Sequence, residues 1–287
     1  MESLPGYLLE RGVFGTRAIL TSEWDSETER SLLKQPIAEL ELNRGKGWRG
    51  KSLEFLSNFP ELLALSIVGR TAEPIEPIHR LHNLRLLRVL AYCKNEIRFH
   101  EFPHLIDCGI QWRPKAMSVF DALGLRVLFI NGFSGTDTRQ FGRLTSLESL
   151  AILGSPIRSL EGLAPLHELR SLRLGDLRQL QSLIGIESLI RLEKLEIGTC
   201  RKIRVIDEVS SLAKLREFYL DNVGDIQSLK PLAQLSQLHR VTFVESTNIL
   251  DGDLSPLVGL PNFELVAFQN RRHYSHRSEV FRPPTPD

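Results

Sequence analysis

The residue pattern most suggestive of chemistry lies at positions 45–52, which read Gly-Lys-Gly-Trp-Arg-Gly-Lys-Ser. This order matches G-x-x-x-x-G-K-[ST], the loop whose glycine backbone surrounds nucleotide phosphates, with Lys51 on the phosphates and Ser52 on Mg²⁺. The preceding residues 37–42 alternate apolar and polar side chains, whereas a phosphate-loop strand is normally apolar on both faces. We therefore interpret 45–52 as a surface loop with Trp48 as an exposed contact residue, and we keep nucleotide binding as an alternative.

Potential zinc ligands crowd between residues 79 and 108. Imidazole and thiolate side chains in sets of four bind zinc tetrahedrally. The candidates are His79, His82, Cys93, His100, His104 and Cys108. However, His167 occupies the same place in its own leucine pattern as His82, which indicates that histidine is simply tolerated there. We predict no metal site, no cofactor and no catalytic set, and therefore not an enzyme.

Composition and charge narrow the possible partners. Lys and Arg total 36 against 35 for Asp and Glu, and a net charge of +1 provides no general attraction to nucleic acid or anionic membrane. No apolar run approaches the ~18 residues of a spanning helix, and the N-terminus lacks a signal-peptide pattern. Three cysteines, an odd number in a long chain, indicate a reducing compartment. We expect a cytoplasmic monomer that binds neither nucleic acid nor membrane.

The elements that must position any site recur with a fixed period. Apolar residues repeat as L-x-x-L-x-L, in groups that are 22 or 23 residues apart where the pattern is most regular, from residue 147 to residue 220. The groups begin at Ile37, Leu62, Leu84, Leu105, Leu125, Leu147, Leu169, Leu192, Leu215, Leu238 and Phe263. A period between 20 and 29 residues with this signature is typical of stacked repeats.

Each group predicts a short strand, because side chains alternate between two faces in a strand. The fourth and sixth positions then point inward, and the third, fifth and seventh point outward. Between the groups runs an apolar ladder with period three, for example Ile157, Leu160, Leu163 and Leu166. That period suits 3₁₀ turns, in which residues i and i+3 eclipse. Because turns are wider than strands, we expect a parallel sheet on the concave side.

These patterns resemble the leucine-rich-repeat family, in particular its internalin-like subclass with 22-residue repeats. The resemblance covers roughly residues 37–269 and implies an α/β solenoid, with a concave parallel sheet and 3₁₀ or short-helix turns on the convex side. The family usually places Asn at the ninth position of each repeat. That position here is held by Ser155, Leu177, Cys200, Val223 and Ser246.

The ends of the chain depart from the repeat. We assign residues 1–36 to an N-terminal cap, with an edge strand at 16–22 and a polar loop or short helix at 24–34. About eleven repeats then occupy 37–269. Residues 270–287, which are basic and end in a proline-rich run, are expected to form a C-terminal cap and flexible tail.

The outward strand positions define the predicted binding face. An apolar strip (Leu86, Leu90, Val127, Phe129 and Leu153) is followed along it by a mixed-charge zone that runs from Arg173 to Arg240. Such surfaces favour protein contacts. The expected contact residues are Leu86, Arg88, Leu90, Val127, Phe129, Leu153, Arg173, Lys194, Glu196, Glu217, Tyr219, Asp221 and Arg240. The sequence therefore predicts a non-enzymatic module that binds a protein partner of unknown identity. Two alternatives stay open: the segment 111–124 covers the apolar strip, or the chain is a purely structural scaffold.

Overall fold

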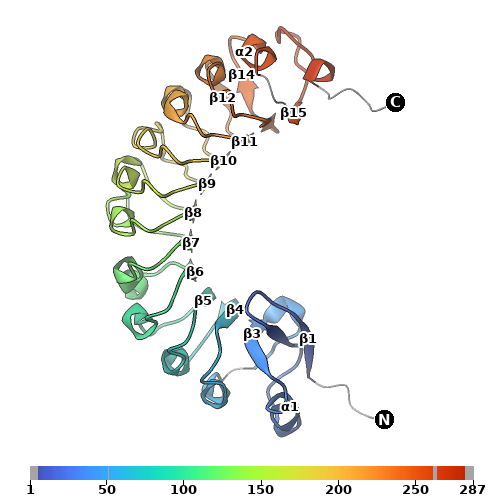
Figure 1. The fold of residues 1–287 in the computed structure, drawn as a ribbon, viewed down its shortest axis with the longest axis vertical. Coiled ribbons are helices and arrows are strands. Elements are labelled where there is room, and N and C mark those ends of the chain that lie inside the picture. The colour runs from blue at the N-terminus through green and yellow to red at the C-terminus, as the bar shows by residue number, and fades with distance from the viewer. Residues whose placement is uncertain (1–5, 51, 261–263, 282–287) are drawn as a thin grey trace. The chain divides into compact units, whose positions relative to one another are not determined.

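The computed structural model describes residues 6–50, 52–260 and 264–281. The chain divides into two compact units, Met1–Ile130 (unit 1) and Asn131–Asp287 (unit 2). In each unit, short strands lie side by side on the inner side and tight turns lie on the outer side (Figure 1). The strand β7 (Val127–Asn131) contains the boundary between the two units.

Unit 2 contains the most regular repeats. Its main strands are all parallel and are hydrogen-bonded in chain order. They are β8 (Ser149–Leu153), β9 (Ser171–Gly175), β10 (Lys194–Gly198), β11 (Glu217–Asp221), β13 (Arg240–Val244) and β15 (Leu265–Phe268). Burial alternates along each strand as predicted; in β8, for example, Leu150 and Ile152 are buried, whereas Leu153 is partly exposed.

The turns of unit 2 follow the period-three ladder. They include η6 (Phe141–Arg143), η7 (Glu161–Leu163), η8 (Asp207–Ser211), η9 (Lys230–Leu232), α2 (Ser255–Val258), η10 (Ser278–Phe281) and the short parallel pair β12 (Asp225–Ile226) and β14 (Asn248–Ile249). The Leu163 amide donates to the Leu160 carbonyl at 2.8 Å, and the Leu166 amide to the Leu163 carbonyl at 2.9 Å. Because these same leucines are fully buried, one residue both closes each turn and fills the core. The predicted 3₁₀ turns are confirmed.

Unit 1 uses the same plan less regularly. Its strands are β1 (Tyr7–Arg11), β2 (Thr16–Leu20), β3 (Ile37–Asn43), β4 (Ala64–Thr71), β5 (Leu86–Tyr92) and β6 (Asp107–Gln111). Its helical turns are α1 (Ser26–Leu32), η1 (Arg44–Lys46), η2 (Glu54–Asn58), η3 (Glu76–Arg80), η4 (Phe99–Glu101) and η5 (Pro114–Asp121). From β2 to β6 the strands are parallel, with register shifts beside β2 and at the end of β4.

The N-terminal segment differs from the sequence prediction in one element. The strand expected at 16–22 is β2, but β1 pairs with it in antiparallel fashion, so β2 is not the edge of the sheet. The predicted polar loop or short helix is α1, whose Asp25 cap accepts hydrogen bonds from two backbone amides. An ion pair 2.7 Å long between the partly exposed Arg17 and the buried Glu39 ties β2 to β3. Glu39 is thereby lost from the outward surface.

The ninth repeat position also needs one correction. Ser155, Leu177, Cys200 and Val223 are buried there, but Ser246 is exposed and Thr247 occupies the buried place. The Thr247 hydroxyl donates to the Leu220 carbonyl at 3.3 Å and accepts from the Val223 amide at 3.1 Å. One extra residue after β13 causes this shift, and the hydroxyl supplies the backbone bonding that Asn provides in the family pattern.

Aromatic rings close the C-terminal end of unit 2. The ring of Phe268 stacks on Phe243 at 4.6 Å and contacts Phe281 edge-on at 5.9 Å. The Tyr274 hydroxyl accepts a hydrogen bond from the Ile249 amide at 3.0 Å. Residues 270–281 therefore pack on the last strand. Phe263, which opens the last predicted group, and the predicted tail over 282–287 lie outside the described residues.

Candidate protein-binding faces

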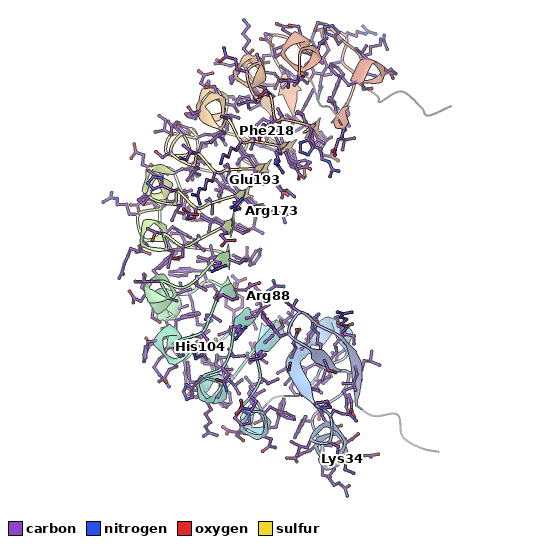
Figure 2. The ribbon with its side chains drawn as sticks, viewed as in Figure 1. Lys34, Arg88, His104, Arg173, Glu193 and Phe218 are labelled. Carbon is purple, nitrogen blue, oxygen red and sulfur yellow. The ribbon has the colours of Figure 1, made fainter. Side chains whose placement is uncertain are left out.

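Three rows of outward side chains cross unit 2. Parallel strands in constant register place equivalent positions side by side, about 4.8 Å apart. The fifth positions, for example, form the row Ala151, Arg173, Glu196, Tyr219 and Thr242. Arg173 of β9 lies on the strand side of the unit, whereas Phe218 of β11 is buried between the sheet and the turns (Figure 2).

The predicted mixed-charge residues come together on this face and pair with one another. Arg173 lies 3.3 Å from Glu196, and Lys194 bridges Glu196 at 2.7 Å and Glu217 at 3.5 Å. Arg240 approaches Glu217 at 4.0 Å. Positive and negative side chains thus alternate along the network, so that Glu196 lies between Arg173 and Lys194, and Glu217 between Lys194 and Arg240. Neighbouring repeats are held together across the face by these contacts.

Tyr219 lies inside this charge network. Its hydroxyl donates to Glu217 at 2.9 Å, and the Lys194 ammonium lies 5.2 Å from its ring centroid. Burial would raise the pKa of Glu217, but the hydrogen bond from Tyr219 and the charges of Lys194 and Arg240 bring it below its usual value. Burial and the Glu217 carboxylate raise the pKa of Tyr219. At neutral pH, Glu217 is therefore ionised and Tyr219 is protonated.

A hollow of about 530 Å³ opens beside the network, along the seventh strand positions of unit 2. Its lining includes Leu153, Gly175, Glu196, Gly198, Tyr219 and Asp221. The Asp221 carboxylate is exposed and forms no ion pair or hydrogen bond with any other residue that the structure describes. The sequence prediction included Asp221 but overlooked the two glycines; their lack of a side chain at an outward position was the signal for a hollow.

The strand face of unit 1 has a different character. Leu90, Val127 and Phe129 are partly exposed there, as the outward alternation requires. Leu86, also predicted to contact a partner, is buried with 9% of its surface exposed and adds little to the apolar area. Leu153, the remaining apolar residue of the prediction, belongs to unit 2.

Arg88 is the charged residue predicted for the face of unit 1. It is exposed on the inner side of the unit (Figure 2) and lies 3.3 Å from Asp107. Its stem crosses Gly109, where a Cβ atom would lie 3.1 Å from the Arg88 Cγ. Burial raises the pKa of Asp107, and the charge of Arg88 opposes this only in part. The arginine thus fills the space that a glycine leaves open.

The segment 111–124 is a repeat turn. Its Lys115 carbonyl accepts from the Ile97 amide at 3.2 Å, and the η5 residues Ala116, Val119 and Phe120 are buried. This segment lies on the turn side of unit 1 (Figure 1), so Leu90 is partly exposed on the opposite side. The alternative in which this segment covers the apolar strip is wrong for unit 1.

Packing explains the glycines Gly47 and Gly50 of the loop 45–52. A Cβ atom at Gly47 would lie 2.4 Å from the Thr21 carbonyl oxygen, and one at Gly50 would meet the Trp48 ring at 2.1 Å. Trp48 is buried, which corrects its expected role as an exposed contact. The loop leads into η2, a 3₁₀ helix of five residues, whereas a phosphate loop opens an α-helix. Lys51 lies outside the described residues.

The histidines and cysteines form no metal cluster within residues 6–50, 52–260 and 264–281. His79 is buried, its Nε2 accepts from the Arg98 amide at 3.0 Å, and burial lowers its pKa. His82 and His167 both bond a backbone oxygen of the next repeat, at 3.0 and 3.4 Å. Their equivalence supports the interpretation that histidine links neighbouring turns at this position.

The three cysteines are free and buried. Cys200 donates a hydrogen bond to the Gly198 carbonyl at 3.3 Å. Burial raises the pKa of the Cys93 and Cys200 thiols to about 11, so both are protonated at neutral pH. Cys108 is fully buried as a small core residue, and burial raises its pKa as well.

Comparisons with known proteins identify the fold. No family model matches the chain, and a search of curated proteins also finds no match. Among solved structures, an internalin (InlF) from Listeria monocytogenes superposes with a TM-score of 0.53 and 19% identity, over 89% of this chain and 87% of its own. Internalin C2 (InlC2) of the same organism superposes with a TM-score of 0.48 and 21% identity, over 74% of this chain and 83% of its own.

The chain has the internalin-like leucine-rich-repeat fold, on the basis of the InlF superposition and of the strands and turns described above. The predicted α/β architecture of parallel strands and 3₁₀ turns is therefore confirmed. At 19% identity the likeness concerns the fold alone. Within the described residues, no helix combines the length and the apolar character needed to cross a membrane.

Proposed function

We propose that the chain is a non-enzymatic module that binds a protein partner on the strand faces of its units. The observation that carries this proposal is the constant register of the strands in unit 2, which aligns outward side chains in rows. A rigid sheet presents these side chains in one geometry, so little ordering entropy is lost on association.

The two faces would contribute differently to binding. On unit 1, Leu90, Val127 and Phe129 offer partly exposed apolar area, and Arg88 flanks them. On unit 2, Tyr219 is an aromatic side chain with a polar tip, of the kind that dominates binding energy at protein interfaces. The other members of the unit 2 face are Leu153, Arg173, Lys194, Glu196, Glu217, Asp221 and Arg240. We assign affinity chiefly to the aromatic and apolar residues and specificity to the charged ones.

Charge and cysteine content support the remaining parts of the proposal. A net charge of +1 favours a protein over a nucleic acid as the partner. Free, buried thiols are compatible with a reducing compartment, and we propose a cytoplasmic monomer.

Site-specific photocrosslinking tests the binding faces. A benzophenone amino acid is introduced at Tyr219 or Phe129, and at the turn residue Ile190, which is 60% exposed, as the control. In extracts of the source cells we expect one protein to be crosslinked from both strand-face positions and not from Ile190. With that partner purified, Tyr219→Ala should weaken binding about 30-fold, the ~2 kcal/mol typical of a hot spot.

Two outcomes would favour a structural scaffold instead. One is a partner that is crosslinked equally well from Ile190. The other is a partner that Phe129→Asp and Tyr219→Ala both retain with unchanged affinity, provided that both variants unfold at the same urea concentration as the wild type.

A further inference from the structure

We propose that the hollow in unit 2 receives an arginine or lysine side chain of the protein partner. This inference rests on the proposed function, and it assigns the chemistry that the unit 2 face recognises. It follows from the shape of the hollow, from the charges around it and from the pairing state of Asp221.

The shape of the hollow depends on missing side chains. Gly175 and Gly198 occupy the seventh, outward positions of β9 and β10 and are paired across the sheet. The space over Gly175 is filled by Leu153, whose Cδ2 atom would lie 2.5 Å from a Cβ atom there. Over Gly198 the nearest atom would be the Asp221 carbonyl oxygen, at 3.9 Å. The open floor of the hollow is therefore the Gly198 backbone.

The charges around the hollow are mostly negative. Its lining carries one base, Arg173, and three acids, Asp176, Glu196 and Asp221. Glu196 pairs with Arg173 at 3.3 Å and with Lys194 at 2.7 Å, and Asp176 pairs with Arg178 at 2.8 Å. Lys194 and Arg178 lie outside the lining. Asp221 is left without a basic partner among the described residues. The unpaired charge of the lining is therefore the negative charge of Asp221, and a cation from outside can pair with it.

A basic side chain fits this arrangement. Gly198 and Asp221 are partners in adjacent strands, so their Cα atoms are about 4.8 Å apart. The aliphatic stem of an arginine or lysine can lie on the glycine backbone while its cationic head reaches the Asp221 carboxylate. The Tyr219 ring, which also lines the hollow, offers a face for a guanidinium group.

Other occupants are less favourable. An acidic side chain would be repelled by the unpaired Asp221 carboxylate. An apolar side chain would take the Asp221 carboxylate out of water without a partner, which is unfavourable for a charged group. Charge complementarity thus selects a cationic group, and the narrow glycine floor selects one on a slender stem.

Two variants test the hollow. Gly198→Leu fills it, and because Gly198 is absent from the left-handed backbone region, the substitution adds no backbone strain. Asp221→Asn removes the charge at nearly constant shape. The matched controls are Gly259→Leu, where a Cβ atom would meet nothing within 4 Å, and Asp207→Asn on the exposed surface of η8. Urea unfolding of all four variants checks that each is folded.

The probes are peptides selected on the wild-type protein from a displayed library of short random sequences. We expect the selected peptides to share an arginine or lysine. A synthetic peptide from this set should bind both controls as tightly as the wild type, and Gly198→Leu and Asp221→Asn about tenfold more weakly, the loss of one charge-assisted hydrogen bond. Replacing its arginine by citrulline, or its lysine by norleucine, should cost about tenfold on the wild type and little more on Asp221→Asn, because the contact is already lost there.

The proposal is overturned if the selected peptides lack a basic residue, if they bind Gly198→Leu with unchanged affinity, or if the neutral replacement has no effect. Peptides that lose affinity for Tyr219→Ala but keep it for Gly198→Leu would overturn the hollow and leave the proposed function intact. Peptides that tolerate every strand-face variant would contradict both.

Discussion

The strand faces of the two units follow one repeat rule and carry different chemistry. In unit 1 the outward residues Leu90, Val127 and Phe129 are apolar, and Arg88 and Asp107 form one ion pair beside them. In unit 2 the outward acids and bases form a continuous alternating network. The inward positions of both units are leucine-rich and buried. The difference teaches that the inward pattern builds the scaffold, while the outward positions are free to differ from one unit to the other.

The backbone of the two units differs as well. Within the described residues, non-glycine residues with positive φ occur only in unit 2: they are Asp176, Thr199, Asn222 and Glu245. Each directly follows a strand. The amides of Asp176, Thr199 and Asn222 bond the next repeat; the Thr199 amide, for example, donates to the Asp221 carbonyl at 2.8 Å. Regular repeats thus impose a left-handed residue even where the side chain disfavours it.

The largest expected effect is the loss of unfolding free energy when a core leucine is shortened. Equal losses in the two units would show that their interiors are packed alike. Leu172→Ala in unit 2 and Leu87→Ala in unit 1 each delete a fully buried side chain and should each lower the free energy of unfolding by ~3 kcal/mol. Urea unfolding measures this. Tryptophan fluorescence reports unit 1, because residues 24, 48 and 112 are the tryptophans of the chain, and circular dichroism reports both units.

Leu172→Met and Leu87→Met serve as controls, because a swap that conserves volume should cost less than ~1.5 kcal/mol. A loss below ~1 kcal/mol for either alanine variant would contradict the view that both cores are equally close-packed.

A smaller effect concerns the strained residues of unit 2. Thr199 has φ 53°, a conformation that costs an L-residue ~1–2 kcal/mol and a glycine nothing. Because glycine loses ~0.5–1 kcal/mol through its greater freedom in the unfolded chain, Thr199→Gly should stabilise the protein by about 0.5 kcal/mol. The control Thr242→Gly, in the strand β13, should destabilise it by about 1 kcal/mol. Equal destabilisation by both glycines would show that Thr199 is unstrained.

The smallest expected effect is the pH dependence of stability, which should have opposite signs for an acid of each strand face. The pKa of Glu217 is lowered in the folded protein, so its contribution is present above pH 4.5 and is lost as the pH falls through the folded value. Glu217→Gln should therefore reduce stability at pH 7 by less than ~1 kcal/mol, as expected for a surface pair, and should match the wild type in acid. Urea midpoints measured across this pH range provide the test.

Asp107 on unit 1 supplies the opposite case. Its folded pKa is raised, so its contribution is present below pH 3.8 and is lost as the pH rises through the folded value. The wild type should therefore lose stability as the pH rises through this value, and Asp107→Asn should abolish that loss. Unfolding followed by tryptophan fluorescence measures it. The same pH trend for both acids would refute the contrast between the faces.

The candidate site was only partly predictable. Outward positions such as Arg173 and Tyr219 follow from the period of two in a strand. Which of them pair is decided in part across strands, as when Lys194 of β10 pairs with Glu217 of β11 at 3.5 Å. The hollow depends in addition on how a side chain packs over the glycines, because Leu153 fills the space over Gly175 but not over Gly198.

The sequence by itself determined the repeat, its strands, its 3₁₀ turns and the inward core, because all of these depend on contacts within one period or between equivalent positions of neighbouring periods. Only the tertiary structure revealed β1, the burial of Trp48 and Leu86, and the place of Thr247. Each of these depends on a particular neighbour: Trp48, for example, packs against Phe55 at 5.7 Å. A periodic pattern specifies what all repeats share, and the packing of individual side chains decides where one repeat differs from the next.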